Sequence, residues 1–166
     1  MQEPEPPYGP PPDMEPPSMR PDDRRGGRRP PPRSIARVPP NDIDAERAVL
    51  GSVMIDNEAA YTALEDLDVD DFYHPGHRTV FSAMIELTTQ NQPVDAVTLS
   101  ALLRTSGGLE QVGGLAFLAE LGEAVPTAAN MKHYAEIVAK KSRARKLIRA
   151  CTESVELAFE TANPDD

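Results

Sequence analysis

Cysteine is nearly absent from the sequence, and this excludes several kinds of site. Cys151 is the one cysteine among 166 residues, so the chain cannot form an internal disulfide or a cysteine-based zinc centre. Because it falls on an apolar row of a predicted helix, we expect Cys151 to be buried as a small hydrophobic residue. The histidines His74, His77 and His133 are not spaced like zinc ligands, and we predict no metal site.

Long apolar runs and catalytic patterns are also missing. No apolar run reaches the length of about 18 residues that a membrane helix needs, and no signal-peptide pattern opens the chain, so we expect a cytoplasmic protein. No nucleophile elbow occurs, and neither glycine pair, at 107–108 or 113–114, is followed by the lysine of a phosphate-binding loop. The residues alone therefore predict no catalytic site and no cofactor in this chain.

Leucine and phenylalanine are absent from residues 1–40, where 14 of the 18 prolines fall. Such a segment buries too little apolar surface to offset the entropy of ordering, so we predict a disordered, partly polyproline II arm. Its stretch at 24–33 mixes arginine and glycine as some single-strand-binding tails do, although a solvated linker is the favoured interpretation. From residue 41 the chain is rich enough in Ala, Leu, Val and Ile for one compact core.

Strand signals are weak throughout, and helical periodicity predicts an all-α fold of six or seven helices. We expect a compact helical head at 41–128 and a long C-terminal helix at 129–166. Gly51 lies within the first predicted helix, where glycine costs about 1 kcal/mol relative to alanine, and so predicts a close helix crossing. The five carboxylates at 65–71 lack calcium-loop spacing and predict a solvated loop. The apolar positions expected to face the core include Tyr61 and Val97.

The long helix is predicted by residues 130–161, which contain neither proline nor glycine. Alternating steps of three and four mark an apolar row, here called the seam: Tyr134, Ile137, Lys141, Ala144, Ile148, Cys151, Val155 and Ala158. A row with this coiled-coil-like period needs a partner. No helix of similar length precedes it, so we expect the seam to dock on another chain or on sequence beyond Asp166.

Charge is distributed unevenly behind the net value of -10. Residues 41–131 carry -12, whereas residues 132–149 carry +6. The basic band on the long helix consists of Lys140, Lys141, Arg143, Arg145, Lys146 and Arg149. It could contact nucleic acid or an acidic partner, or simply keep the helix soluble. The acidic body is a poor candidate for gripping duplex DNA over its whole surface.

Several stretches, in a fixed order, resemble the N-terminal domain of bacterial replicative DNA helicases of the DnaB type. They are VPPNDIDAERAVLGSVMID from Val38, DDFYHPGHRTVF from Asp70, QPVDAVTL from Gln92, GGLAFLAEL from Gly113 and VPTAANMKHYAEIV from Val125. The resemblance implies an all-α head followed by a helical hairpin. The long helix would be the first arm of that hairpin, and the second arm would lie beyond the end of this sequence.

The same resemblance implies a function in DNA replication. Six copies of the family's domain form a collar on a ring-shaped hexamer, often as a trimer of dimers. The collar binds the C-terminal domain of primase and takes part in helicase loading. ATP and Mg²⁺ belong to a separate RecA-like domain, and single-stranded DNA passes through the full-length ring. The chain would then be part of a 5′ to 3′ ATP-dependent helicase, with no ATPase activity or cofactor of its own. The alternative is a stand-alone helical module that binds single strands through the arm and the basic band.

The resemblance also suggests which residues face partners. The candidates for primase or oligomer contacts are Asp44, Phe117, Ile137, Ile148 and Val155. Of these, Asp44, Phe117 and Ile148 are expected to line the primase side, and Ile148 also lies on the seam with Ile137 and Val155. Phe117 could equally be a core residue. At Asp44 and Arg47 the family commonly has Glu and Gln, so the first keeps its charge and the second adds a cation.

Overall fold

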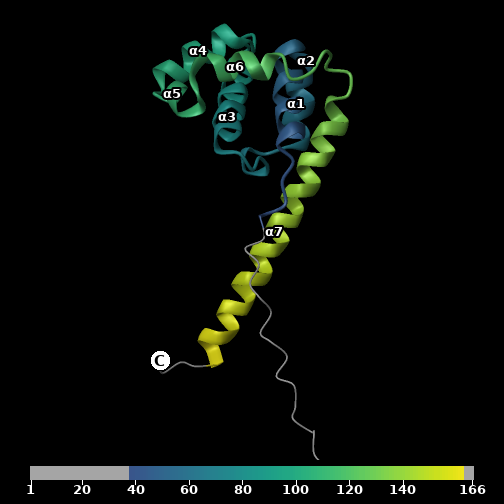
Figure 1. Ribbon diagram of the computed structural model, residues 1–166, viewed down its shortest axis with the longest axis vertical. Coiled ribbons are helices and arrows are strands. Elements are labelled where there is room, and N and C mark those ends of the chain that lie inside the picture. Colours follow the sequence, from purple (N-terminus) through teal and green to yellow (C-terminus); the bar gives the residue numbers. More distant parts are fainter. Residues whose placement is uncertain (1–37, 163–166) are drawn as a thin grey trace, which may run out of the picture. The chain divides into compact units, whose positions relative to one another are not determined.

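The computed structural model describes residues 38–162, so nearly all of the predicted arm lies outside the described residues. Within this range the chain is helical and contains no strand, which confirms the all-α prediction. The elements are α1 (Ile43–Ile55), α2 (Glu58–Asp66), the 3₁₀ turn η1 (Val69–Asp71), α3 (Pro75–Thr89), α4 (Ala96–Thr105), α5 (Leu109–Val112), α6 (Gly114–Gly122) and α7 (Met131–Ala162). Helices α1 to α6 gather into a head, and α7 runs along one side of it and then projects beyond it (Figure 1).

Helices α1, α3 and α4 begin at N-cap side chains that accept their free N–H groups. Asp42 accepts from Ala45 N at 3.0 Å at the start of α1, and Asp95 accepts from the first turn of α4. Pro75 is the first residue of α3, a position that suits its fixed φ and missing N–H. These caps place the starts of α1, α3 and α4 at definite residues.

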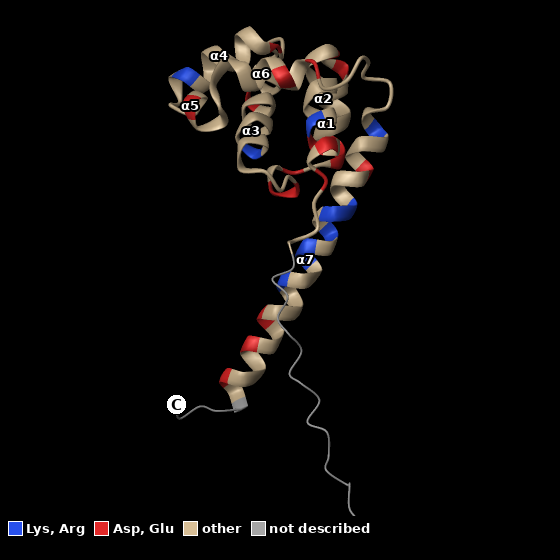
Figure 2. Ribbon diagram, in the orientation of Figure 1, with Lys and Arg blue, Asp and Glu red and all other residues tan. Residues whose placement is uncertain are grey.

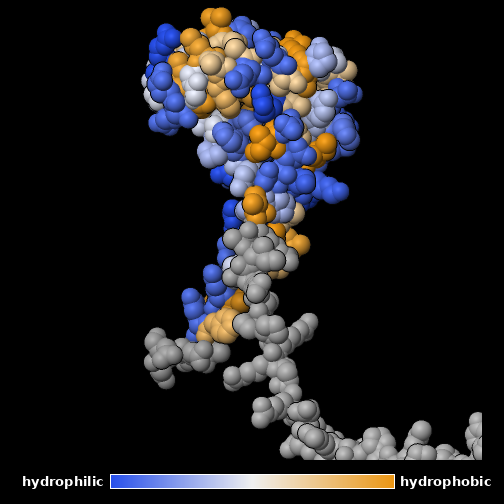
Figure 3. Space-filling view, viewed as in Figure 1, coloured by the Kyte–Doolittle hydropathy of each residue, from blue (hydrophilic) through white to orange (hydrophobic). Residues whose placement is uncertain are grey.

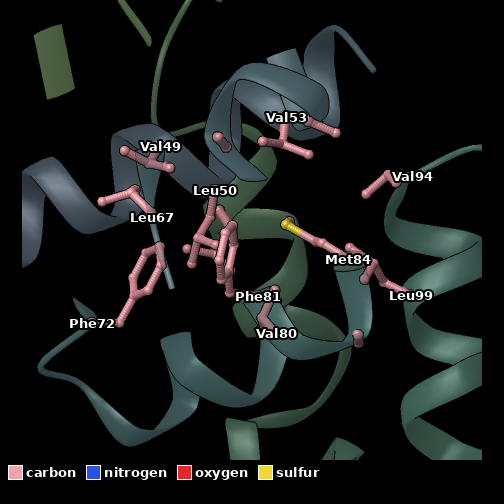
Figure 4. Packing of buried hydrophobic residues seen from close by; sticks show 14 of the residues in the cluster. Val49, Leu50, Val53, Leu67, Phe72, Val80, Phe81, Met84, Val94 and Leu99 are labelled. Atoms are coloured by element: carbon pink, nitrogen blue, oxygen red, sulfur yellow. The ribbon is translucent and has the colours of Figure 1, made fainter. Parts of the chain in front are cut away.

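The core of the head is built from large apolar side chains of α1, α3, α4 and α6. Leu50, Phe81, Leu99 and Leu118 are all at most 1 % exposed. Figure 4 shows Leu50, Phe72 and Phe81 packed together, and the centroids of the Phe72 and Phe81 rings lie 4.6 Å apart. Burial of each such side chain stabilises the fold by about 1.5 to 3 kcal/mol, so these positions dominate the stability of the head.

Gly51 lies at a close approach of α1 and α6, as the sequence predicts. A Cβ atom at this position would collide with the carbonyl oxygen of Leu121 and lie 3.3 Å from the Cβ of Ala124. Since only glycine lacks that atom, the prediction of a close helix crossing is confirmed.

Two apolar residues predicted to face the core are instead exposed: Tyr61 by 51 % and Val97 by 76 %. In α2 the buried face consists of Ala59, Ala60 and Ala63, which leaves the Tyr61 ring on the outer side. The helices α2, α4 and α6 are short, and each buries a narrower face than its apolar residues would cover. The prediction was therefore wrong at the edges of these faces.

Helix α7 docks on the head through its first half. Met131, Ala135, Val138 and Ser142 form a buried row, called the head row, against α1, α2 and η1. The long helix, expected to dock on another chain or on sequence beyond Asp166, thus docks in its first half on the head, through a row other than the seam. Several shorter helices suffice because only about three turns are covered, and every residue from Lys146 to Thr161 is exposed.

Candidate partner-binding surface

Helix α7 carries two rows of residues on different sides. The head row faces α1 and α2, whereas the seam begins at Tyr134 and passes through Ile148 and Val155. At about 100° per residue, the seam lies roughly 130° around the helix axis from the head row. The seam therefore lies on a different side of α7 from the row that faces the head.

The seam changes from partly covered to exposed along the helix. Tyr134 and Ile137 are half-buried and pack against the core. Ile148 is 53 % exposed and Val155 is 55 % exposed. Apolar surface is visible on the part of α7 that extends below the head (Figure 3). Among the candidate residues, Ile137 thus lies at the head and the other two lie on the projecting half.

Cys151 lies on the exposed part of the seam. The prediction that it is buried was wrong, because α7 has already left the head at this position. The periodicity places Cys151 in the seam, but only the first part of that row, at Tyr134 and Ile137, packs against the head.

The basic band divides into two groups. Arg145 donates to the carbonyl oxygen of Pro40 at 2.8 Å and to that of Asp71, and its guanidinium lies 5.7 Å from the centroid of the Tyr73 ring. Lys146 Nζ donates to Asp71 Oδ1 at 2.7 Å. The other members are exposed or half-exposed: Lys140, Lys141, Arg143 and Arg149. Figure 2 shows the band in blue on the middle of α7, with acidic residues farther along.

Asp71 corrects the prediction of a fully solvated loop at 65–71. It is 7 % exposed, and its Oδ1 also accepts from Ser142 Oγ at 2.6 Å. Burial alone would raise the pKa of Asp71, but hydrogen bonds from Asp68 N–H, Lys146 and Ser142 outweigh it and hold the pKa below its ordinary value. The same hydrogen bond with Asp71 raises the pKa of Lys146.

A second buried carboxylate, Glu46, joins α1 to the start of α3. It is 1 % exposed, accepts from the backbone N–H groups of Tyr73 and His74 at 2.6 and 3.2 Å, and lies 2.8 Å from His77 Nδ1. Burial raises the pKa of Glu46, but these hydrogen bonds outweigh it and lower the pKa overall. The buried role of Glu46 was not predicted from the sequence. The available signal was its helical spacing with the buried Val49 and Leu50.

Phe117 packs on this cluster from α6. Its ring lies 5.7 Å from His77 and 6.2 Å from His74, stacked on both imidazoles, and the side chain is half-buried. Asp44 is exposed in the first turn of α1. One turn later, Arg47 pairs with Glu120 of α6 at 3.7 Å, so these two helices are neighbours. Asp44 and Phe117 therefore belong to adjacent helices of the head.

Residues 38–162 lack two other features. No group of three or more His, Cys, Asp or Glu side chains could hold a metal ion there. In the same range, no helix is long and apolar enough to cross a membrane.

The head and the long helix correspond to a known protein family. The family described as the DnaB-like helicase N terminal domain matches residues 38–140, which include the whole head and most of the docked part of α7. The chain belongs to this family. The expectation drawn from the ordered motifs is thereby confirmed.

Curated relatives of this DnaB-type domain are replicative helicases. The chain is 48 % identical over 116 residues to the replicative DNA helicase DnaB of Geobacillus stearothermophilus, covering 70 % of this chain and 26 % of the relative. It is 40 % identical over 137 residues to the DnaB of Mycobacterium leprae, covering 82 % of this chain and 23 % of the relative. The chain thus spans about a quarter of the length of these helicases.

Solved structures show the same fold. The N-terminal domain of DnaB helicase from Mycobacterium tuberculosis matches with a TM-score of 0.74 and 40 % identity, covering 76 % of this chain and 90 % of that one. A DnaB-like replicative helicase, described with its interactions with primase, matches with a TM-score of 0.64 and 27 % identity. That match covers 71 % of this chain and 28 % of the helicase.

Proposed function

We propose that the chain forms part of the collar of a hexameric replicative DNA helicase, where it mediates self-association and docks primase. One observation carries the proposal. The head is fully packed, yet the projecting half of α7 leaves Ile148 and Val155 more than half exposed. An apolar helix face of this kind is typical of a surface that another helix covers.

In the full-length protein, the covering helices would come from the second arm of the hairpin and from a neighbouring subunit, in a hexamer built as a trimer of dimers. Unwinding in the 5′ to 3′ direction, with bound ATP and Mg²⁺, would be carried out by a separate domain. Single-stranded DNA would pass through the complete ring. A helicase loader and a cytoplasmic location belong to the same proposal, which is supported by the replicative helicases among the relatives.

Primase is the second proposed partner. Phe117 keeps part of its ring accessible while it stacks on His74 and His77, and Asp44 is exposed on the adjacent helix α1. We place both residues on the primase side of the collar, and we place Ile137, Ile148 and Val155 on the self-association side. A described relative of this fold interacts with primase, which supports the choice of partner.

The primase proposal is tested by titrating the chain against the C-terminal domain of the cognate primase. Phe117→Ala should weaken binding at least tenfold, since aromatic anchors dominate most interfaces. Tyr61→Ala is a matched control, because Tyr61 is an exposed aromatic residue of α2 outside this surface. Unchanged affinity of a Phe117→Ala chain with intact helicity would contradict the assignment.

Stand-alone binding of single-stranded nucleic acid has less support. Arg145 and Lys146 are already engaged with Pro40 and Asp71, which leaves four members of the basic band available to a partner. We propose that Lys140, Lys141, Arg143 and Arg149 contact an acidic partner surface or nucleic acid within the assembled ring. Steep salt dependence of single-strand binding by the chain alone would instead favour the stand-alone module.

A further inference from the structure

Helix α7 leaves the head at a cluster of charged and polar contacts. Ser142 is the last buried residue of the helix, and exposure is continuous from Lys146 onward. Three segments meet at this point: the entry to α1 at Pro40, the turn η1 with Asp71, and α7 itself. We call this cluster, made of Asp71, Ser142, Arg145, Lys146 and the Pro40 carbonyl, the exit hub.

The Asp71 side chain accepts hydrogen bonds within its own turn, at η1, and from α7. Its Oδ2 accepts from Asp68 N at 2.9 Å, which fixes the carboxylate on η1. Its Oδ1 accepts from Ser142 Oγ at 2.6 Å and from Lys146 Nζ at 2.7 Å, one helical turn apart on α7. Two successive turns of α7 are therefore bonded to one nearly buried carboxylate.

Arg145 fastens the same turn of α7 to two backbone segments. It donates to Pro40 O at 2.8 Å and to Asp71 O, and its guanidinium lies over the Tyr73 ring. These partners lie about a hundred and about seventy residues away in the sequence. A planar guanidinium bound to two carbonyls and an aromatic ring has little freedom to move.

We propose that the exit hub is the brace that sets the direction in which the projecting half of α7 leaves the head. Its consequence for assembly, a fixed position for the Ile148 and Val155 face, rests on the proposed function. The brace itself does not.

The position of the hub gives it leverage. Without it, the last apolar contacts of α7 with the core would be those of the buried Val138 and the partly buried Ala139, and the seven residues from Lys140 to Lys146 would join the unsupported part. At about 1.5 Å per residue, the free lever would lengthen by about 10 Å. Because a helix is stiff along its axis, small tilts at the head become larger displacements farther out. Contacts at the exit point limit these displacements most.

The distance distribution between α7 and the head tests the brace directly. Native Cys151 lies on the projecting half, and a second spin label is introduced at the exposed Val97 of α4 by Val97→Cys. Labelled chains are diluted with unlabelled Cys151→Ser chains, so that distances within one chain dominate the pulsed electron paramagnetic resonance signal. Arg145→Ala and Asp71→Asn should each widen the distribution roughly twofold, because the free lever lengthens.

Arg149→Ala is the matched control, since Arg149 is an exposed cation of the same helix outside the hub. It should leave the distribution as narrow as in the unsubstituted chain. Ser142→Ala, which removes one neutral hydrogen bond, serves as a milder variant if Arg145→Ala lowers the helical circular dichroism. An unchanged width in folded Asp71→Asn and Ser142→Ala chains would overturn the proposal, and so would equal widening by Arg149→Ala.

Sedimentation of the same samples separates this inference from the proposed function. If the chain stays monomeric while the hub variants still widen the distribution, the brace stands and the proposed self-association fails. If the chain associates but the width does not respond to the hub, the proposed function stands and the brace is wrong.

Discussion

At the scale of single residues, two buried carboxylates join segments that are distant in the sequence. Glu46 holds the turn before α3, and Asp71 holds α7. Both look like ordinary acidic residues in the sequence, because neither propensity nor spacing shows which carboxylate will meet backbone N–H groups after folding. The partners of Asp95 lie within the next turn of the chain, where local sequence can indicate a helix cap, whereas the partners of Glu46 lie 27 to 31 residues away.

Removal of the Glu46 carboxylate should be costly. Glu46→Ala leaves His77 and two backbone N–H groups without their acceptor in a buried place, so we expect the free energy of unfolding to fall by about 3 kcal/mol. Urea denaturation followed by circular dichroism measures this change. The exposed Glu110→Ala should change stability by no more than about 0.5 kcal/mol. Equal effects of the two substitutions would show that the Glu46 network does not stabilise the fold.

The stability of the head should fall on acidification in two stages. Burial, together with the nearby His77, lowers the pKa of His74 from its ordinary 6.5, so the folded chain resists its protonation and loses stability as the pH falls below 6.5. Glu46 and Asp71 have lowered pKa values, so the stability they contribute is present above their ordinary values of 4.5 and 3.8 and is lost below them. The midpoint of urea denaturation, measured at intervals between about pH 8 and about pH 3, reports the loss of stability in both stages.

The first stage can be removed separately. His74 Nδ1 accepts from Gly76 N at 3.1 Å, and His74→Asn supplies another N-cap acceptor that does not titrate. This variant should keep its stability through the upper stage and lose it only in the lower one. An upper stage that persists in His74→Asn would assign the loss to another group.

At the scale of helices, packing decides which face of a periodic element is buried. The spacing of α7 correctly marks an apolar seam, but the row that faces the head is Met131, Ala135, Val138 and Ser142. A search for apolar residues at helical spacing does not find this row, because Ser142 is polar and its burial depends on the hydrogen bond to Asp71. The existence of the long helix was predictable, whereas its docking face was not.

The close crossing of α1 and α6 should make the fold sensitive to substitution at Gly51 but not at Gly122. Gly51→Ala gains about 1 kcal/mol of helix propensity, yet its Cβ would meet the Leu121 carbonyl, so we expect a net loss of about 1 to 3 kcal/mol in thermal unfolding. Gly122→Ala is the matched control. Its Cβ would meet only the Met54 side chain at 3.5 Å, an ordinary contact, and it should be neutral or slightly stabilising. A Gly51→Ala chain at least as stable as the unsubstituted one would contradict the close crossing.

At the scale of the whole molecule, the head and the projecting half of α7 differ in how much of their apolar surface is buried. The head completes its own core, and the projecting half exposes apolar residues to water. The ordered motifs identified the family from the sequence because they span most of residues 38–140. Which parts of α7 remain uncovered could not be read from them, since this depends on where the helix leaves the head.

The most direct test of the account is sedimentation equilibrium of the chain and of two variants. Ile148→Asp combined with Val155→Asp places charges on the exposed seam, whereas Leu157→Asp places one on an equally exposed position of another face of α7. We predict that the unsubstituted chain associates and that the seam variant weakens association at least tenfold, with the helical content unchanged. Leu157→Asp should have a much smaller effect. A chain that remains monomeric at high concentration, or a seam variant that associates as well as the unsubstituted chain, would contradict self-association through this helix.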